Sequence, residues 1–174
     1  MKKKLFVIPF TLILAGLLNS CEWFDNLVDI SFDTEYTNID FTVYPAEAGD
    51  HVFADILTQS DIEDEIEEHG GDAVDLDDIT VSEAVLIIQT AGVTFDPFER
   101  IEVYVSTIDV PEVLIGSASL NPNGLVEVTL DVSDESLVEI IEADEYNVRV
   151  IGTLAEELTT EVDMRLRVSY HVIV

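Results

Sequence analysis

Apolar and polar residues alternate along much of this chain, most regularly at its C-terminal end. Every second residue from Val162 to Val174 is apolar, and polar residues such as Asp163, Arg165 and His171 lie between them. Successive side chains of a strand point to opposite faces of a sheet, so this pattern predicts a long, half-buried strand.

Seven further segments have the composition of strands. They are residues 28–32, 39–43, 84–88, 101–105, 111–118, 126–130 and 146–150. Six of them contain alternating or turn-bounded apolar residues, whereas 84–88 is apolar throughout, which is typical of a central strand buried on both faces. Asn121, Pro122, Asn123 and Gly124 favour a type I turn and predict a hairpin between the strands on either side.

Two short helices are predicted between the strands. Ser60 is placed to cap a helix over residues 61–69, with Glu63 completing a capping box and Gly70 ending it. Ser133 is placed to cap a second helix over residues 134–142. Because helices are too few to alternate with the strands, we expect a mainly β fold: an antiparallel β-sandwich of about eight strands, with a β-barrel as the alternative.

The N-terminal segment has the three parts of an export signal. Lys2, Lys3 and Lys4 precede an uncharged apolar run over residues 5–18, and Leu18-Asn19-Ser20-Cys21 follows it. The run is too short to cross about 30 Å of hydrocarbon comfortably as a helix. A plain signal peptide and an uncleaved signal anchor are alternatives, but the spacing of Leu18 and Ser20 from Cys21, the single cysteine, favours a third reading.

This segment resembles the signal peptide of bacterial lipoproteins, whose lipobox has leucine three residues before the cysteine and a small residue directly before it. The resemblance implies cleavage after Ser20 and acylation of Cys21, which would hold the protein on a membrane. Residues 1–20 are then the signal peptide, 21–26 a lipidated tether, and 27–174 a single domain. Glu22, where the enteric sorting rule has aspartate for inner-membrane retention, implies the outer membrane of a Gram-negative bacterium, on either its periplasmic or its surface face.

Strong negative charge narrows the possible partners. The chain has 37 acidic and seven basic residues, and three of the basic ones are the signal-peptide lysines. The chain without its signal peptide therefore has four arginines against 37 acids, a net charge of −33. Binding to nucleic acid is excluded, because it requires Lys and Arg to displace counterions.

Three explanations fit the acidic residues: solvation in high salt, binding of divalent cations, or an acidic face for a basic partner. The densest cluster runs from Asp61 to Asp78. Within it, the best candidate calcium ligands are Asp72, Asp75, Asp77 and Asp78, since calcium takes six to eight oxygen ligands. Calcium is the one cofactor that the sequence suggests, although the EF-hand spacing is absent.

Other chemistry finds little support in the sequence. His51, His69 and His171 are far apart and form no zinc-binding pair, and no GxSxG motif marks a nucleophilic serine. The arginines are expected to pair with carboxylates across the sheets, with an arginine-lined binding patch as the alternative.

The sequence thus predicts a lipid-anchored, exported protein with a non-catalytic binding or structural role at the cell envelope. Its expected partners are the membrane, through Cys21, and a protein in the envelope. A calcium-dependent binding or adhesion module and an envelope hydrolase are the alternatives.

Overall fold

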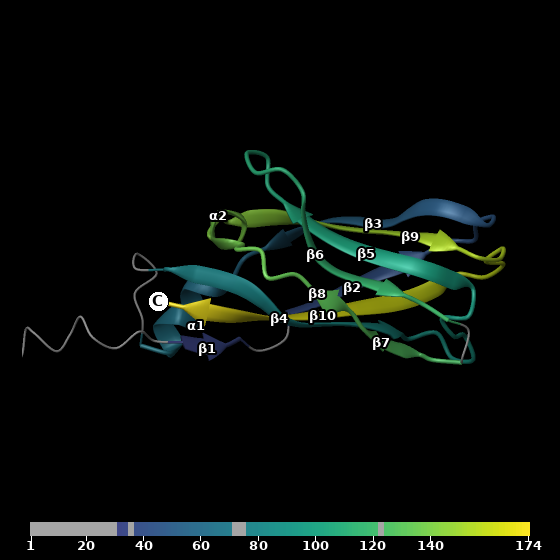
Figure 1. The fold of residues 1–174 in the computed structure, drawn as a ribbon, viewed down its shortest axis with the longest axis horizontal. Helices are drawn as coiled ribbons and strands as arrows, with labels where there is room; N and C mark the ends of the chain where they lie inside the picture. The colour runs from purple at the N-terminus through teal and green to yellow at the C-terminus, as the bar shows by residue number, and fades with distance from the viewer. Residues whose placement is uncertain (1–30, 35–36, 71–75, 122–123) are drawn as a thin grey trace, which may run out of the picture. The chain divides into compact units, whose positions relative to one another are not determined.

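Two antiparallel β-sheets lie face to face in this protein (Figure 1). The computed structural model describes residues 31–34, 37–70, 76–121 and 124–174, and Ser31–Val174 forms one compact unit. Ten strands and two short helices lie within the described ranges. The predicted mainly β, antiparallel sandwich with two helices is confirmed.

Sheet I is organised around β10, the long strand that the alternation predicted. β10 pairs along one side with β1 and β2 and along the other with β4, which also pairs with β7. The strands are β1 (Ser31–Asp33), β2 (Thr37–Val43), β4 (Asp78–Ile88), β7 (Glu127–Thr129) and β10 (Val162–Ile173). β1 lies alongside the C-terminal end of β10, where Ser31 is opposite Ile173.

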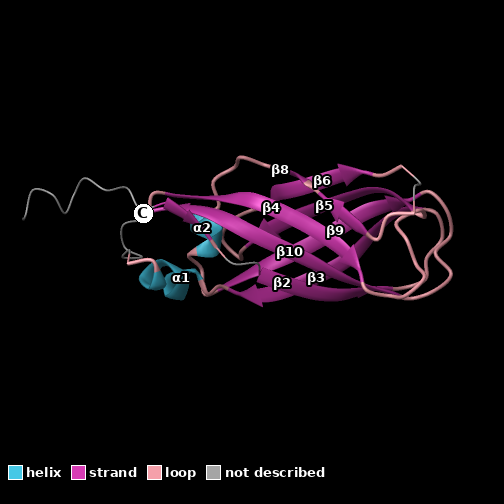
Figure 2. Cartoon of the chain, turned by 90° about the horizontal axis from the view of Figure 1, so that it is seen from below, coloured by secondary structure: helices cyan, strands magenta, loops and turns pink. Residues whose placement is uncertain are grey.

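Sheet II has the strand order β3-β9-β5-β6-β8. Its strands are β3 (Gly49–Gln59), β5 (Phe98–Ser106), β6 (Val113–Ser119), β8 (Asp131–Val132) and β9 (Glu145–Leu154). The helices are α1 (Ile62–Glu68), between β3 and β4, and α2 (Val138–Ile141), between β8 and β9. Figure 2 shows both helices at the same end of the strands.

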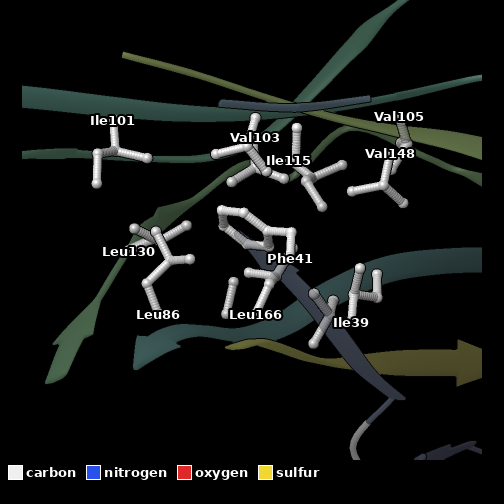
Figure 3. Close-up of a cluster of buried hydrophobic side chains, with 14 of the residues drawn as sticks. Ile39, Phe41, Leu86, Ile101, Val103, Val105, Ile115, Leu130, Val148 and Leu166 are labelled. Carbon is white, nitrogen blue, oxygen red and sulfur yellow. The ribbon is translucent and has the colours of Figure 1, made fainter. Parts of the chain in front are cut away.

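The core fills the space between the two sheets. Leu86 and Leu166 of sheet I are buried against Val103 and Ile115 of sheet II, and Figure 3 shows these side chains reaching toward one another from the two layers. This arrangement follows from alternation, because every second residue of a regular strand such as β9 or β5 faces inward.

The predicted hairpin at residues 121–124 is wrong. β6 pairs with β5 and β8 in sheet II, whereas β7 pairs with β4 in sheet I. The chain therefore crosses between the sheets after β6, and it returns to sheet II at β8. Turn residues favour a change of direction, but they do not determine which sheet receives the next strand. Pro122 and Asn123 lie outside the described residues.

β3 was not predicted, because a β-bulge interrupts its alternation. Val52 is opposite Ile151 and Ala54 is opposite Val150, so Phe53 is the extra residue of the bulge. Phe53 and Ala54 are both buried. Two consecutive inward residues break the period of two on which the sequence reading depended. The two-residue strand β8 was also missed.

The helices are shorter than predicted, and their serines do not cap them. Ser60 Oγ instead donates to the carbonyl of Ile141, at 2.5 Å, and α1 has no side-chain cap. Ser133 Oγ accepts a local hydrogen bond from the Glu135 amide, at 3.2 Å. The Leu137 amide donates to the carbonyl of Ile79 in β4, at 2.8 Å, so the chain stays attached to the sheet and α2 begins only at Val138.

Candidate functional site

The predicted site residues are only partly within the described chain. Cys21, Asp72 and Asp75 lie outside it. The Asp77 amide donates to the carbonyl of Ile173, and Asp78 begins β4 with its carboxylate accepting from Ser136 Oγ, at 2.5 Å. Within the described ranges, no three His, Cys, Asp or Glu side chains are grouped so that they could hold a metal ion.

The three histidines lie at separate places in the fold. His51 bonds the carbonyl of Glu47, His69 stacks on Phe32 with ring centroids 3.9 Å apart, and His171 contacts Asp33 at 2.9 Å. Each ring therefore has a local structural contact.

The hydrolase alternative requires a serine activated by a histidine, and these two residue types occur close together in sequence on the outward face of sheet I. Ser169 lies two residues before His171, whose Nδ1 contacts Asp33. Ser169 Oγ, however, is bonded to Ser82 Oγ at 2.7 Å, at the bulge where β4 and β10 change register. The hydrogen bond between serine and imidazole that activates a nucleophile is not among the contacts of the described residues.

Arginines pair with carboxylates, and Arg165 does so across neighbouring strands, as the sequence predicted. Arg165 of β10 makes two hydrogen bonds to Asp40 of β2, at 2.7 and 2.8 Å, and these two residues are opposite each other in the register. Arg149 Nη1 bonds Glu112 Oε1 at 2.7 Å, and Arg100 pairs with Glu102 along its own strand.

Substitution of Arg165 by glutamine is expected to raise the pKa of Asp40. The hydrogen bonds from Arg165 hold the pKa of that carboxyl below its ordinary value. A group with a lowered pKa in the folded state stabilises the protein above its unfolded pKa, and the benefit is lost as pH falls through the folded pKa. The stability difference between Arg165→Gln and the unmodified protein should therefore be present at neutral pH and disappear in acid.

This expectation is checked by a carboxyl-carbon NMR titration together with urea unfolding at several pH values. Arg149→Gln is the matched control, because it removes an arginine from the other sheet and should leave the pKa of Asp40 unchanged. An unchanged pKa of Asp40 in Arg165→Gln would contradict the assignment.

A cleft of about 690 Å³ lies at one end of sheet II and is the strongest candidate site. Its floor is a row of outward side chains on three neighbouring strands, since Asn147 of β9 is opposite both Leu57 of β3 and Ser106 of β5. Two walls complete the lining, and we call this site the acidic cleft. Its lining residues are Leu57, Gln59, Ser106, Thr107, Ile108, Asp109, Val110, Glu139, Ala143, Asp144, Glu145 and Asn147.

The loop between β5 and β6 forms one wall and projects from sheet II beside α2 (Figure 1). Thr107 fixes its shape: its Oγ1 accepts the amide of Val110 at 3.0 Å, and its own amide donates to the Val110 carbonyl at 3.1 Å. Ile108 therefore lies at the tip of a hydrogen-bonded turn, and its side chain is fully exposed.

The turn between α2 and β9 forms the other wall. Ser60 holds it from the adjoining end of β3, because its amide donates to the carbonyl of Asp144, at 3.0 Å, and its hydroxyl to that of Ile141. The hydroxyl that the sequence assigned to a helix cap thus positions this wall.

Apolar side chains and carboxylates share this cleft. Leu57 is 64% exposed on the floor, and Ile108 stands at the rim. The four charged lining residues are Asp109, Glu139, Asp144 and Glu145, and all of them are acidic. Such a cleft is suited to apolar side chains flanked by Lys or Arg.

Two other hollows expose less apolar surface than the acidic cleft. One of about 670 Å³ lies around Ser82, Glu83 and Ser169 on sheet I. A smaller one, of about 160 Å³, is lined by hydroxyls including those of Tyr146 and Tyr170, whose pKa values are raised by burial. The first contains one exposed apolar side chain, Val132 at 36%, and the apolar side chains that line the second are buried, so neither matches Leu57 and Ile108 of the acidic cleft.

Sequence reasoning missed the acidic cleft. Ile108 does give a signal, because it departs from the odd-numbered inward positions Ile101, Val103 and Val105 and lies between Thr107 and Asp109. Leu57 lies in β3, the strand whose alternation the bulge interrupts, so the sequence pattern did not predict its pairing with Asn147.

Comparison with protein-family models found no match for this chain, and comparison with curated proteins found none either. Neither of the described helices has the length and apolar character needed to cross a membrane.

Proposed function

We propose that this protein is a lipid-anchored envelope protein that binds a protein partner in the acidic cleft, without catalysis. The signal peptide would direct export, and acyl chains on Cys21 would hold the protein on the outer membrane. The acidic domain itself is repelled by anionic lipid, so membrane attachment depends on the acyl chains.

One observation carries the binding proposal: Ile108 is fully exposed at the tip of a hydrogen-bonded turn, close to the exposed Leu57. The fold gains nothing from an isoleucine in water. Burying an aliphatic side chain of this size contributes roughly 1.5–3 kcal/mol, so a partner that covers Ile108 and Leu57 gains affinity from both.

Charge defines the chemistry of the partner. Carboxylates around the cleft attract a segment that carries Lys or Arg beside its apolar residues, and they repel acidic proteins. A basic partner also removes the mutual repulsion of these carboxylates, which favours the complex.

The test is photocrosslinking of the full chain in its native cells, with p-benzoylphenylalanine in place of Ile108. We expect one discrete adduct in the membrane fraction, and its crosslinked peptide should contain apolar residues together with Lys or Arg. The same photoreactive residue in place of Val126, which is 50% exposed and outside the cleft, is the control and should give no such adduct.

Two further variants separate the parts of the proposal. Leu57→Asp should reduce the adduct severalfold, because it places a charge on the apolar floor. Cys21→Ser should move the protein out of the membrane fraction. Equal adducts from positions 108 and 126 would contradict binding in the cleft, and unchanged fractionation of Cys21→Ser would contradict the anchor.

A further inference from the structure

β3 is the longest strand at an edge of either sheet. It has 11 residues, whereas the other edge strands are β2 with seven, β1 and β7 with three each, and β8 with two. Within the described part of the chain, β3 pairs with β9 alone. Its outer edge, the one away from β9, therefore presents backbone N–H and C=O groups along a long strand.

Among the features that usually protect an edge, the C-terminal half of β3 has only one charged side chain, Asp55. From Ala54 to Gln59 the pairing with β9 is regular, because the bulge lies before it at Phe53. This half contains no proline and no lysine, and it carries the exposed Leu57 on its outward face. Natural edges of this length are normally blocked by Lys, Pro or bulges.

We infer that the partner binds by adding an extended, basic segment as a strand to the outer edge of β3, between Ala54 and Gln59. This inference rests on the proposed function and specifies the geometry of binding. Backbone hydrogen bonds would supply part of the affinity, and side chains at alternate positions would supply specificity.

Outward side chains of β3 specify what the added strand carries. A residue opposite Leu57 is apolar and extends the hydrophobic floor of the acidic cleft. A residue opposite Asp55 is Lys or Arg, since the Asp55 carboxylate is exposed and its hydrogen bond from Asn147, at 2.5 Å, leaves it room to accept another. Directly opposed side chains lie about 5 Å apart, which brings both pairs into contact.

A second copy of this chain is a poor occupant of the same edge. It would bring another strongly acidic domain against Asp55 and the cleft carboxylates, and like charges directly opposite each other are destabilising. A basic strand from a different protein meets no such repulsion.

The test uses the full chain purified in detergent and a blocked synthetic hexapeptide, Lys-Thr-Leu-Val-Lys-Thr. Added antiparallel, it places leucine opposite Leu57 and its second lysine opposite Asp55. We expect saturable binding in titration calorimetry, with slower amide hydrogen exchange confined to the segment around Asp55–Gln59. N-methylation of alternate backbone amides should weaken Kd by at least about tenfold, because it removes the hydrogen bonds of strand pairing.

Two controls test the side-chain contacts. The same hexapeptide with both lysines replaced by glutamate should not bind. Leu57→Ser should weaken Kd by about fivefold or more, whereas Leu125→Ser, an exposed leucine outside the cleft, should leave Kd unchanged.

Each outcome has one meaning. Equal binding of the N-methylated hexapeptide would overturn strand addition while leaving binding in the cleft intact. Absence of binding by the unmodified hexapeptide, or equal binding of its glutamate form, would overturn the inferred segment; the photocrosslinking result tests the proposed function separately. Concentration-dependent dimers protected at β3 would overturn the assignment to a different protein.

Discussion

Replacement of Gly152 by alanine is expected to lower the free energy of unfolding by at least about 2 kcal/mol. Gly152 lies in β9, the strand between β3 and β5, where it is opposite His51 and Ile101. A Cβ atom at this position would lie 2.3 Å from the carbonyl oxygen of Arg100 and 2.7 Å from the ring of Phe53. The backbone of β5 would have to shift, because a carbonyl oxygen cannot rotate away as a side chain can.

The bulge in β3 adds a second obstacle at residue 152, beside the carbonyl of Arg100. Phe53 is the inserted residue, and its ring packs against Phe98 in an edge-to-face contact with centroids 5.5 Å apart. This ring occupies the space that a side chain of residue 152 would need.

Urea unfolding of Gly152→Ala and Gly116→Ala measures the effect with a matched control. A Cβ at Gly116 would lie 3.1 Å from the Cβ of Leu130, a much smaller overlap than that at Gly152, so its cost should be clearly smaller. Equal stabilities of the two variants would show that the close approach at Gly152 is not a constraint.

Raising KCl from 10 mM to 1 M is expected to stabilise the lipid-free chain, residues 22–174, by several kcal/mol, which corresponds to about 10 °C in Tm. Residues 22–174 carry a net charge of −33, and their compact state suffers from self-repulsion. The Debye length falls from about 30 Å to about 3 Å over this range, so most of the repulsion is screened. Thermal unfolding followed by circular dichroism gives the measurement.

A variant and a second salt show the origin of this stabilisation. Glu63→Gln combined with Glu67→Gln removes an exposed i, i+4 pair of like charges from α1 and should reduce the dependence of Tm on salt. CaCl2 at the same ionic strength tests the calcium alternative: extra stabilisation by micromolar calcium would indicate a specific site, to be sought at Asp72, Asp75, Asp77 and Asp78. A Tm that does not change with KCl would contradict the charge argument.

How far sequence predicts this fold depends on whether a feature is local. The inward residues of β10, such as Leu166 and Val168, were predicted because alternation is a property of the strand itself. The crossover after β6 was not, because the choice between sheets depends on strands far away in the chain. The predicted helix starts failed for a similar reason: the hydroxyl of Ser60 bonds the distant carbonyl of Ile141, and the Leu137 amide bonds the carbonyl of Ile79 in β4.

The acidic cleft shows the same limit for a site. Its acidic character follows from composition, but its floor exists only because β3, β9 and β5 bring Leu57, Asn147 and Ser106 into one row. The predicted calcium ligands, by contrast, came from clustering along the sequence. Of these, Asp77 and Asp78 contribute a backbone contact and a hydrogen bond to Ser136, respectively.

The position of β10 in sheet I has a consequence for the order of folding. β1, β2 and β4 all pair with β10, the last of the ten strands to be synthesised, and none of them is hydrogen-bonded to another of the three. Contacts between residues as distant as Ser31 and Ile173 are slow to form. Sheet I therefore cannot be completed until β10 has been synthesised, whereas the strands of sheet II can pair with one another before it.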